Sequence, residues 1–295
     1  MNRIRNRLTA RQMLNWTRIN ILLVITIVLG GCIFSGCKSR DLKSDQLYQQ
    51  TDVSFESKVD AYQSYDEVLQ TYVDSSGRVD YNNLGQNPLQ LNNFIGFLAK
   101  VSPENHPELF PTQNDKKAYW INAYNALMMK SVIDNPDITS VNQISWGKGI
   151  FWRTKFIVGG KERTLHQIEN GILRKRYKDP RIHFAINCAS NSCPPPGNQI
   201  LSGDSLDEQL NYKLQQFIRN SSNVFVSHDT KEIKLSRIFK WYKSDFTANG
   251  MSLKEYVLQS LLDIPDRKRK TVLQDYKVGY FKYDWGLNGM TLDKP

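Results

Sequence analysis

The sequence predicts an α+β fold, a helix-rich single domain with small antiparallel β-hairpins. Several long segments carry apolar residues at helical spacing, and two pairs of short strands are joined by turn residues. Helices separate these hairpins without a regular β-α-β alternation, which favours α+β over a parallel α/β sheet. The chain has 295 residues and is 40% hydrophobic, enough to bury one substantial core. We therefore expect one globular domain over residues 54–295.

Residues 1–37 are typical of an export signal. A basic segment precedes the apolar run Ile21–Leu29, and small residues and cysteines follow it. This run is shorter than the roughly 20 residues that a transmembrane helix needs. Both LGGC, which ends at Cys32, and FSGC, which ends at Cys37, resemble the bacterial lipobox, whose cysteine is lipidated and becomes the new N-terminus.

Counting the cysteines favours Cys37 over Cys32 as the lipidated residue. Cleavage at Cys32 would leave three thiols in an oxidising compartment, whereas cleavage at Cys37 leaves the pair Cys188 and Cys193. Residues 38–53 are polar and would form a tether between membrane and domain. The alternative is an uncleaved N-terminal anchor, with the domain on the same side of the membrane. In both cases we expect an exported envelope protein, on the periplasmic side or at the outer membrane, whose membrane contact is its leader.

The net charge of +10 does not indicate a nucleic-acid-binding protein. Seven positively charged residues precede the first acidic residue, Asp41, so the rest of the chain has a net charge of only +3. The basic run 267–270 lacks interleaved aromatic residues, and we interpret it as a solvated face. No Gly-rich strand-to-helix turn suited to a phosphate or dinucleotide occurs, so we expect no cofactor.

Three helices are expected in the N-terminal half. They span residues 54–73, 89–101 and 114–134. The first places Val59, Tyr62, Tyr65, Val68 and Leu69 on one face, and a short extended segment, Val79–Tyr81, follows it. The third has a wide apolar stripe that predicts burial, with Asn114 or Asp115 as its cap.

Two hairpins and further helices make up the C-terminal half. In residues 154–164, Gly159-Gly160 joins an apolar strand to a polar one. Residues 224–226 and 232–235 predict the second hairpin. Helices are expected at 165–177, 204–220, 236–246 and 252–264, and an aromatic terminal strand within 276–289.

The segment RIHFAINCASNSCPPP, Arg181–Pro196, is the main candidate for a functional site. It holds His183 and the only two cysteines outside the leader, Cys188 and Cys193, directly before three prolines. An apolar run that ends at such a loop and at a rigid proline tract is a common way to present side chains at the end of a strand.

Four motifs in this order resemble the domain family of unknown function number five hundred and forty-seven. They are AYWINAYNAL, TLHQIENGILR, RIHFAINCASNSCPPP and IFKWYKSDF, and the resemblance covers residues 67–246. It implies an occurrence in bacterial envelope proteins and plant proteins, and no established activity. Members of the family tend to have a histidine after the Ile-Glu pair, where this chain has Asn170, so no role of that histidine is carried over.

The first functional hypothesis is a thiol-dependent hydrolase or acyl transferase with Cys188 or Cys193 as its nucleophile. Such a thiolate needs a base or a positive field nearby. If residues 182–188 form one strand, His183 and Cys188 lie five apart and hence on opposite faces, which favours Cys193 as the partner of His183.

Four more residues belong to this hypothesis. His166 and Glu169, three apart on the 165–177 helix, could reach the same place. Asn122 and Asn125, three apart on the 114–134 helix, could orient a catalytic group or substrate, or simply bind adjoining backbone. The substrate, a small molecule or a protein, is not specified.

The second hypothesis is a non-catalytic binding or scaffolding module in which a Cys188–Cys193 disulfide locks the loop. The third is a zinc site of Cys188, Cys193, His183 and His166. Its spacing matches no common zinc motif, and thiol-rich zinc sites are less expected in an oxidising space. We therefore expect no metal.

Overall fold

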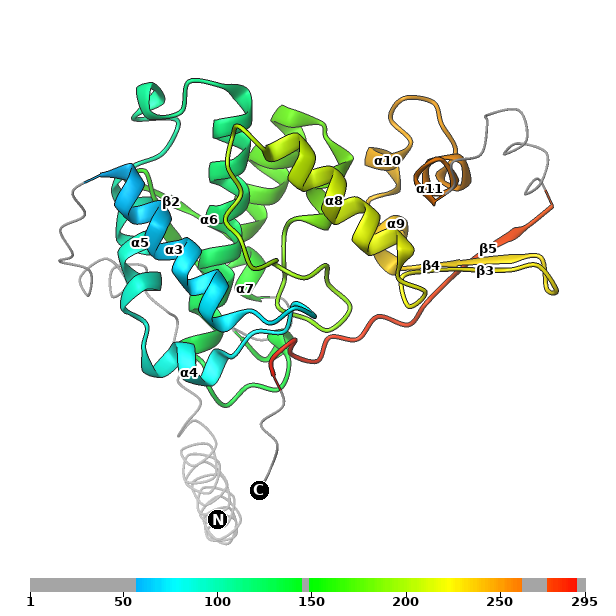
Figure 1. Cartoon of the computed structure of the whole chain (residues 1–295), viewed down its shortest axis with the longest axis horizontal. Coiled ribbons are helices and arrows are strands. Elements are labelled where there is room, and N and C mark those ends of the chain that lie inside the picture. The colour runs from blue at the N-terminus through cyan, green and yellow to red at the C-terminus, as the bar shows by residue number, and fades with distance from the viewer. Residues whose placement is uncertain (1–56, 145–148, 262–274, 291–295) are drawn as a thin grey trace, which may run out of the picture. The chain divides into compact units, whose positions relative to one another are not determined.

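A computed structural model of the chain describes residues 57–144, 149–261 and 275–290. The expected leader and tether, with Cys32 and Cys37, lie outside this part, as do residues 54–56, 262–274 and the basic run. The described residues belong to one compact unit and form the helix-rich α+β fold that was predicted, with two small sheets (Figure 1). No helix in these ranges is long and apolar enough to cross a membrane.

The first helices are α3 (Lys58–Tyr72), α4 (Tyr81–Gln86), α5 (Leu89–Lys100) and α6 (Gln113–Ile133). Helix α3 begins at Lys58 because the Ser57 side chain accepts a hydrogen bond from the Asp60 backbone N–H. It packs on α5, where the rings of Tyr65 and Phe94 stack at 4.6 Å. Val59 does not share the buried face of Tyr65 and Leu69 as expected: it is 71% exposed, because a rotation of about 100° per residue carries it away from that face.

Helix α6 lies at the centre of the fold and is buried over most of its length (Figure 1). Its cap is Thr112, not Asn114 or Asp115 as expected. The Thr112 hydroxyl accepts from the Asp115 N–H, and the Asp115 carboxylate accepts from the Thr112 N–H. This reciprocal pair satisfies two backbone donors at the start of the helix.

The first hairpin is as predicted. Strands β1 (Phe156–Val158) and β2 (Lys161–Arg163) are antiparallel, and the turn residues Gly159 and Gly160 have φ of +59° and +73°. Gly159 also lies so close to Ser102 that a Cβ would be 2.1 Å from the Ser102 Oγ. The turn therefore needs glycine both for its backbone conformation and for its packing on the end of α5.

The second hairpin belongs to a three-stranded mixed sheet. Strands β3 (Val224–Ser227) and β4 (Glu232–Leu235) are antiparallel, as expected, and β5 (Lys277–Tyr280) pairs with β4 in parallel. The terminal strand therefore joins the hairpin, which the alternation pattern of the sequence did not predict.

Residues 182–188 do not form the strand that would place His183 and Cys188 on opposite faces. Residues Pro180–Phe184 form the 3-10 helix η4, and no regular element follows it before α8 (Leu206–Arg219). The Asp179 side chain accepts from the Arg181 N–H, and Pro180 occupies the first helical position, so the chain turns here instead of extending. The argument that placed His183 and Cys188 on opposite faces therefore no longer applies.

Two other predicted helices differ in their winding or continuity. Residues Gln167–Tyr177 form a π-helix, η3, which is wider than the α-helix expected over 165–177. Residues 236–246 form two short helices, α9 (Arg237–Trp241) and α10 (Lys243–Phe246), because the chain leaves helical geometry at Tyr242. Helix α11 spans Leu253–Leu261, and the remaining short elements are α7 (Gly149–Trp152), η1 (Pro107–Leu109) and η2 (Val141–Gln143).

The apolar side chains form two core clusters. One lies among α3–α6 and η3, and the other among α8–α11 and the three-stranded sheet. Trp285 packs against both.

Candidate functional site

A cavity of about 370 Å³ lies where the two core clusters meet. Five of the seven predicted site residues line it, namely Cys188, Cys193, His183, His166 and Glu169. Aromatic side chains supply much of the remaining wall, namely Tyr124, Phe151, Trp152, Trp241, Tyr242, Tyr283 and Trp285. The fold thus brings η3, the cysteine loop, the end of α9 and the terminal segment to one place.

The cysteine loop is held by its own side chains and by the terminal segment. Buried Asn187 accepts from the Ala189 N–H and donates to the Pro194 carbonyl, and Ala189 has a φ of +57°. A non-glycine residue in this left-handed region is strained and needs such support. The terminal segment runs along the loop, with Asn288 N–H donating to the Ala189 carbonyl. This pairing brings Tyr283 to the cysteines.

Cys188 is the thiol with the lowered pKa. Its Sγ lies 3.0 Å from the Ser190 Oγ and 3.3 Å from the Tyr283 hydroxyl. Burial raises the pKa of Cys188, but hydrogen bonds from Cys193, Ser190 and Tyr283 outweigh it and bring the pKa from 9.0 to about 7. These donors stabilise a thiolate at neutral pH.

Cys193 has the opposite character. Burial and the neighbouring Cys188 raise its pKa, so it stays protonated while Cys188 ionises. Its Sγ accepts from the Cys188 backbone N–H at 2.9 Å. Both cysteines are free thiols and partly exposed.

His183 belongs to a charged group with Asp245 and Arg174. Its Nε2 lies 2.7 Å from the Asp245 Oδ2, and the Arg174 guanidinium binds both oxygens of that carboxylate, at 2.6 and 2.9 Å. Burial raises the pKa of Asp245, but these hydrogen bonds and charges outweigh it and hold the pKa well below its usual range. The His183 ring stacks on Tyr242 at 3.9 Å, and its Nδ1 is buried without a hydrogen-bond partner among the described residues.

Helix η3 contributes Glu169 to the same cavity, and His166 directly precedes this helix. The Glu169 Oε1 accepts from the Tyr242 hydroxyl at 2.6 Å. The His166 Nδ1 lies 2.8 Å from the Asn170 Nδ2, and its ring stacks on Trp152 at 3.5 Å. Burial lowers the pKa of His166, so its imidazole is neutral at pH 7.

Asn122 and Asn125 bind backbone and do not line the cavity. Asn122 exchanges two hydrogen bonds with the backbone of Leu201, at 2.8 and 3.2 Å. Asn125 donates to the Ala185 carbonyl and accepts from the Asn187 N–H. Asn125 therefore positions the chain between His183 and Cys188.

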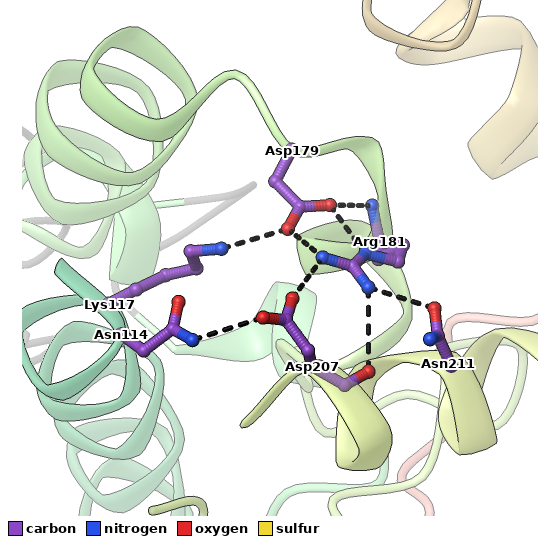
Figure 2. A network of polar contacts seen from close by, with 6 residues as sticks. All are labelled: Asn114, Lys117, Asp179, Arg181, Asp207 and Asn211. Atoms are coloured by element: carbon purple, nitrogen blue, oxygen red, sulfur yellow. Dashed lines mark hydrogen bonds and ion pairs between the residues drawn. The ribbon is translucent and has the colours of Figure 1, made fainter. Parts of the chain in front are cut away.

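An ion-pair network holds the start of this segment against α6 and α8 (Figure 2). Asp179 accepts from Lys117 at 2.9 Å and from Arg181 at 2.7 and 2.9 Å, and Arg181 also reaches Asp207 at 2.6 Å. Asn114 binds the same Asp207 carboxylate. Burial raises the pKa of Asp179, but its two cationic partners outweigh this and lower the pKa to about 2. A single residue, Ile182, separates Arg181 of this network from His183.

No group of three or more metal-ligating side chains occurs within the described ranges. Cys188, Cys193, His183 and His166 line one cavity, but their nearest polar partners are hydroxyl, carboxylate and amide groups of the protein.

Comparison with known proteins finds one family that the middle of the chain resembles. Residues 109–218 match the family described as "Protein of unknown function, DUF547". No curated protein and no solved structure matches the chain. The matched segment runs from η1 into α8 and contains Cys188, Cys193, His183 and Glu169.

Three further site residues follow the matched segment in sequence. Asp245, Tyr242 and Tyr283 were not among the predicted site residues, although the motif IFKWYKSDF contains two of them. The carboxylate in the motif IFKWYKSDF was the sequence feature that could have indicated Asp245 as a site residue. Nothing local to Tyr283 indicated its contact with Cys188, which spans 95 residues.

Proposed function

We propose that the domain is a thiol-dependent hydrolase or acyl transferase with Cys188 as its nucleophile. The observation that carries this proposal is the set of donors around the Cys188 Sγ, which lowers its pKa to about 7 inside a ligand-sized cavity. The thiolate would attack an acyl carbon and form a carbon–sulfur bond. The tetrahedral intermediate would expel an amine or alcohol, leaving a thioester that water hydrolyses or a second nucleophile takes over.

His183 is the residue suited to carry the proton. Asp245 engages its Nε2, which leaves Nδ1 as the nitrogen that can exchange a proton in the cavity. In this scheme it would protonate the leaving group and later deprotonate the attacking water. No hydrogen bond joins His183 to either sulfur among the described residues, so Cys188 depends on its hydroxyl donors, not on the imidazole, to ionise.

Alkylation by iodoacetamide tests this proposal, with each cysteine followed by peptide mass spectrometry between about pH 5 and pH 10. We expect Cys188 to react first, with a midpoint near pH 7, and Cys193 to react only at higher pH. Cys193→Ser is the matched variant, because it removes a thiol from the same loop and keeps the nucleophile. If Cys193 reacts first, or if Cys188 titrates near 9, the assignment is wrong.

The competing function is a non-catalytic binding module with a Cys188–Cys193 disulfide. It is supported by the hydrogen bond between the two thiols, which brings the sulfur atoms together in the loop. The same mass spectra distinguish the two functions. Quantitative bridging that resists mild reductant would support the disulfide and exclude a nucleophilic Cys188.

We also propose that the domain is exported and held at the membrane by a lipid on Cys37, with Cys32 as the alternative. The support is the sequence pattern of residues 1–37. Mass spectrometry of the mature N-terminus in the native host tests it: a diacylated Cys37 is expected, and an unmodified full-length chain would refute it.

A further inference from the structure

The cavity beside Cys188 has walls that discriminate by charge. The described residues that line it include one carboxylate, Glu169, and neither lysine nor arginine. We infer that the site takes substrates that carry a quaternary ammonium or protonated amine group next to the reacting acyl carbon. This inference rests on the proposed function for the identity of the reacting atom.

Three aromatic rings form a contiguous wall next to the sulfur. Trp241 lies 4.7 Å from Tyr283 and 5.6 Å from Trp285, and the last two lie 4.5 Å apart, measured between ring centroids. The hydroxyl of the same Tyr283 lies 3.3 Å from the Cys188 Sγ. Trp241 is 43% exposed and lies at the edge of the cavity. Aromatic faces attract cations, and clusters of such rings bind quaternary ammonium groups.

The fixed charges favour the same ligand. Glu169 is only 7% exposed, and its Oε1 accepts from the Tyr242 hydroxyl at 2.6 Å, so its carboxylate is fixed at the wall. The guanidinium of Arg174, which lies over the Tyr242 ring, is bound by both oxygens of Asp245, so that carboxylate compensates its charge. His166 adds no positive charge at pH 7, because burial lowers its pKa. An anionic substrate would meet Glu169 and the Cys188 thiolate without a compensating cation.

Choline and 3,3-dimethylbutan-1-ol form a matched pair of probes, because they have the same shape and differ in charge. Isothermal titration calorimetry on the Cys188→Ser chain measures binding without any reaction. We expect choline to bind at least about tenfold more tightly than the uncharged alcohol, and acetate not to compete. In the unaltered chain, choline should protect Cys188 from iodoacetamide and the alcohol should not.

Two variants connect the binding to the walls. Glu169→Gln keeps an acceptor for the Tyr242 hydroxyl and should weaken the binding of choline about fivefold, while the binding of the uncharged alcohol stays unchanged. Trp241→Ala should weaken the binding of choline by a similar factor. Glu208→Gln is the control, because it removes an exposed carboxylate on α8. Equal binding of choline and the alcohol, or displacement of choline by acetate, would overturn the inference. Rapid alkylation of Cys188 together with absent choline binding would refute this inference and leave the proposed function standing.

Discussion

Cys188 has a low pKa because of donors that come partly from far along the chain, and Tyr283→Phe removes one of them. The change deletes the hydroxyl that lies 3.3 Å from the Cys188 Sγ and keeps the ring. Because the thiolate loses a hydrogen-bond donor, the pKa of Cys188 should rise. The Ser190 hydroxyl lies 3.0 Å from that of Tyr283, so Ser190→Ala tests the other half of the same network.

The size of the effect follows from how far the donors lower the pKa of Cys188. Burial raises the pKa of Cys188, and three donors nevertheless lower it from 9.0 to about 7. Each donor therefore lowers the pKa by on the order of 1, or about 1.4 kcal/mol. At pH 7 the thiolate fraction then falls from about one half to about one tenth in Tyr283→Phe, and to about one hundredth when Ser190→Ala is added.

The assay is the rate of iodoacetamide alkylation at Cys188 as a function of pH. At pH 7 we expect about a fivefold lower rate for Tyr283→Phe and about a fiftyfold lower rate for the double variant. The rates should converge at about pH 10, where the thiolate dominates in every variant. Tyr212→Phe, an exposed tyrosine on α8, is the control. An unchanged midpoint in the double variant would refute the assignment of these hydroxyls as thiolate donors.

Three further changes test the scaffold by urea unfolding. In the folded protein the pKa of Asp179 is about 2, below its usual 3.8, so its ion pairs add about 2 kcal/mol to the free energy of unfolding above pH 4. This contribution is lost as the pH falls to about 2. Asp179→Asn should abolish this pH dependence. Gly77→Ala should lower the free energy of unfolding by about 2 kcal/mol more than Gly250→Ala does. Both glycines have a φ of +81°, but only at Gly77 would a Cβ clash with a neighbour, the Pro195 Cβ at 2.1 Å. Asp245→Asn should lower the free energy of unfolding by about 3 kcal/mol, because it leaves the partly buried Arg174 guanidinium without its carboxylate. An equally stable variant would contradict that role.

Local patterns in the sequence determined most of the individual elements. Gly159-Gly160 predicted the first hairpin because a turn with two positive φ angles favours glycine at both positions. The apolar stripe of α6 predicted its burial, since helical spacing gathers those side chains on wide faces. The concentration of His183, Cys188 and Cys193 in one segment likewise predicted where the cavity would be.

Tertiary structure alone decided the chemistry of that cavity. The Asp179-Pro180 turn replaced the expected strand with a 3-10 helix, and the parallel pairing of β5 with β4 joined segments that no local pattern relates. Asp245 reaches His183 across 62 residues and Tyr283 reaches Cys188 across 95. Residue spacing encodes hydrogen bonds within a turn or helix, whereas the pKa of a thiol depends on which distant donors the packed core brings to it. The sequence thus located the cysteine segment, and the packing of the terminal segment on the loop gave Cys188, not Cys193, the lowered pKa.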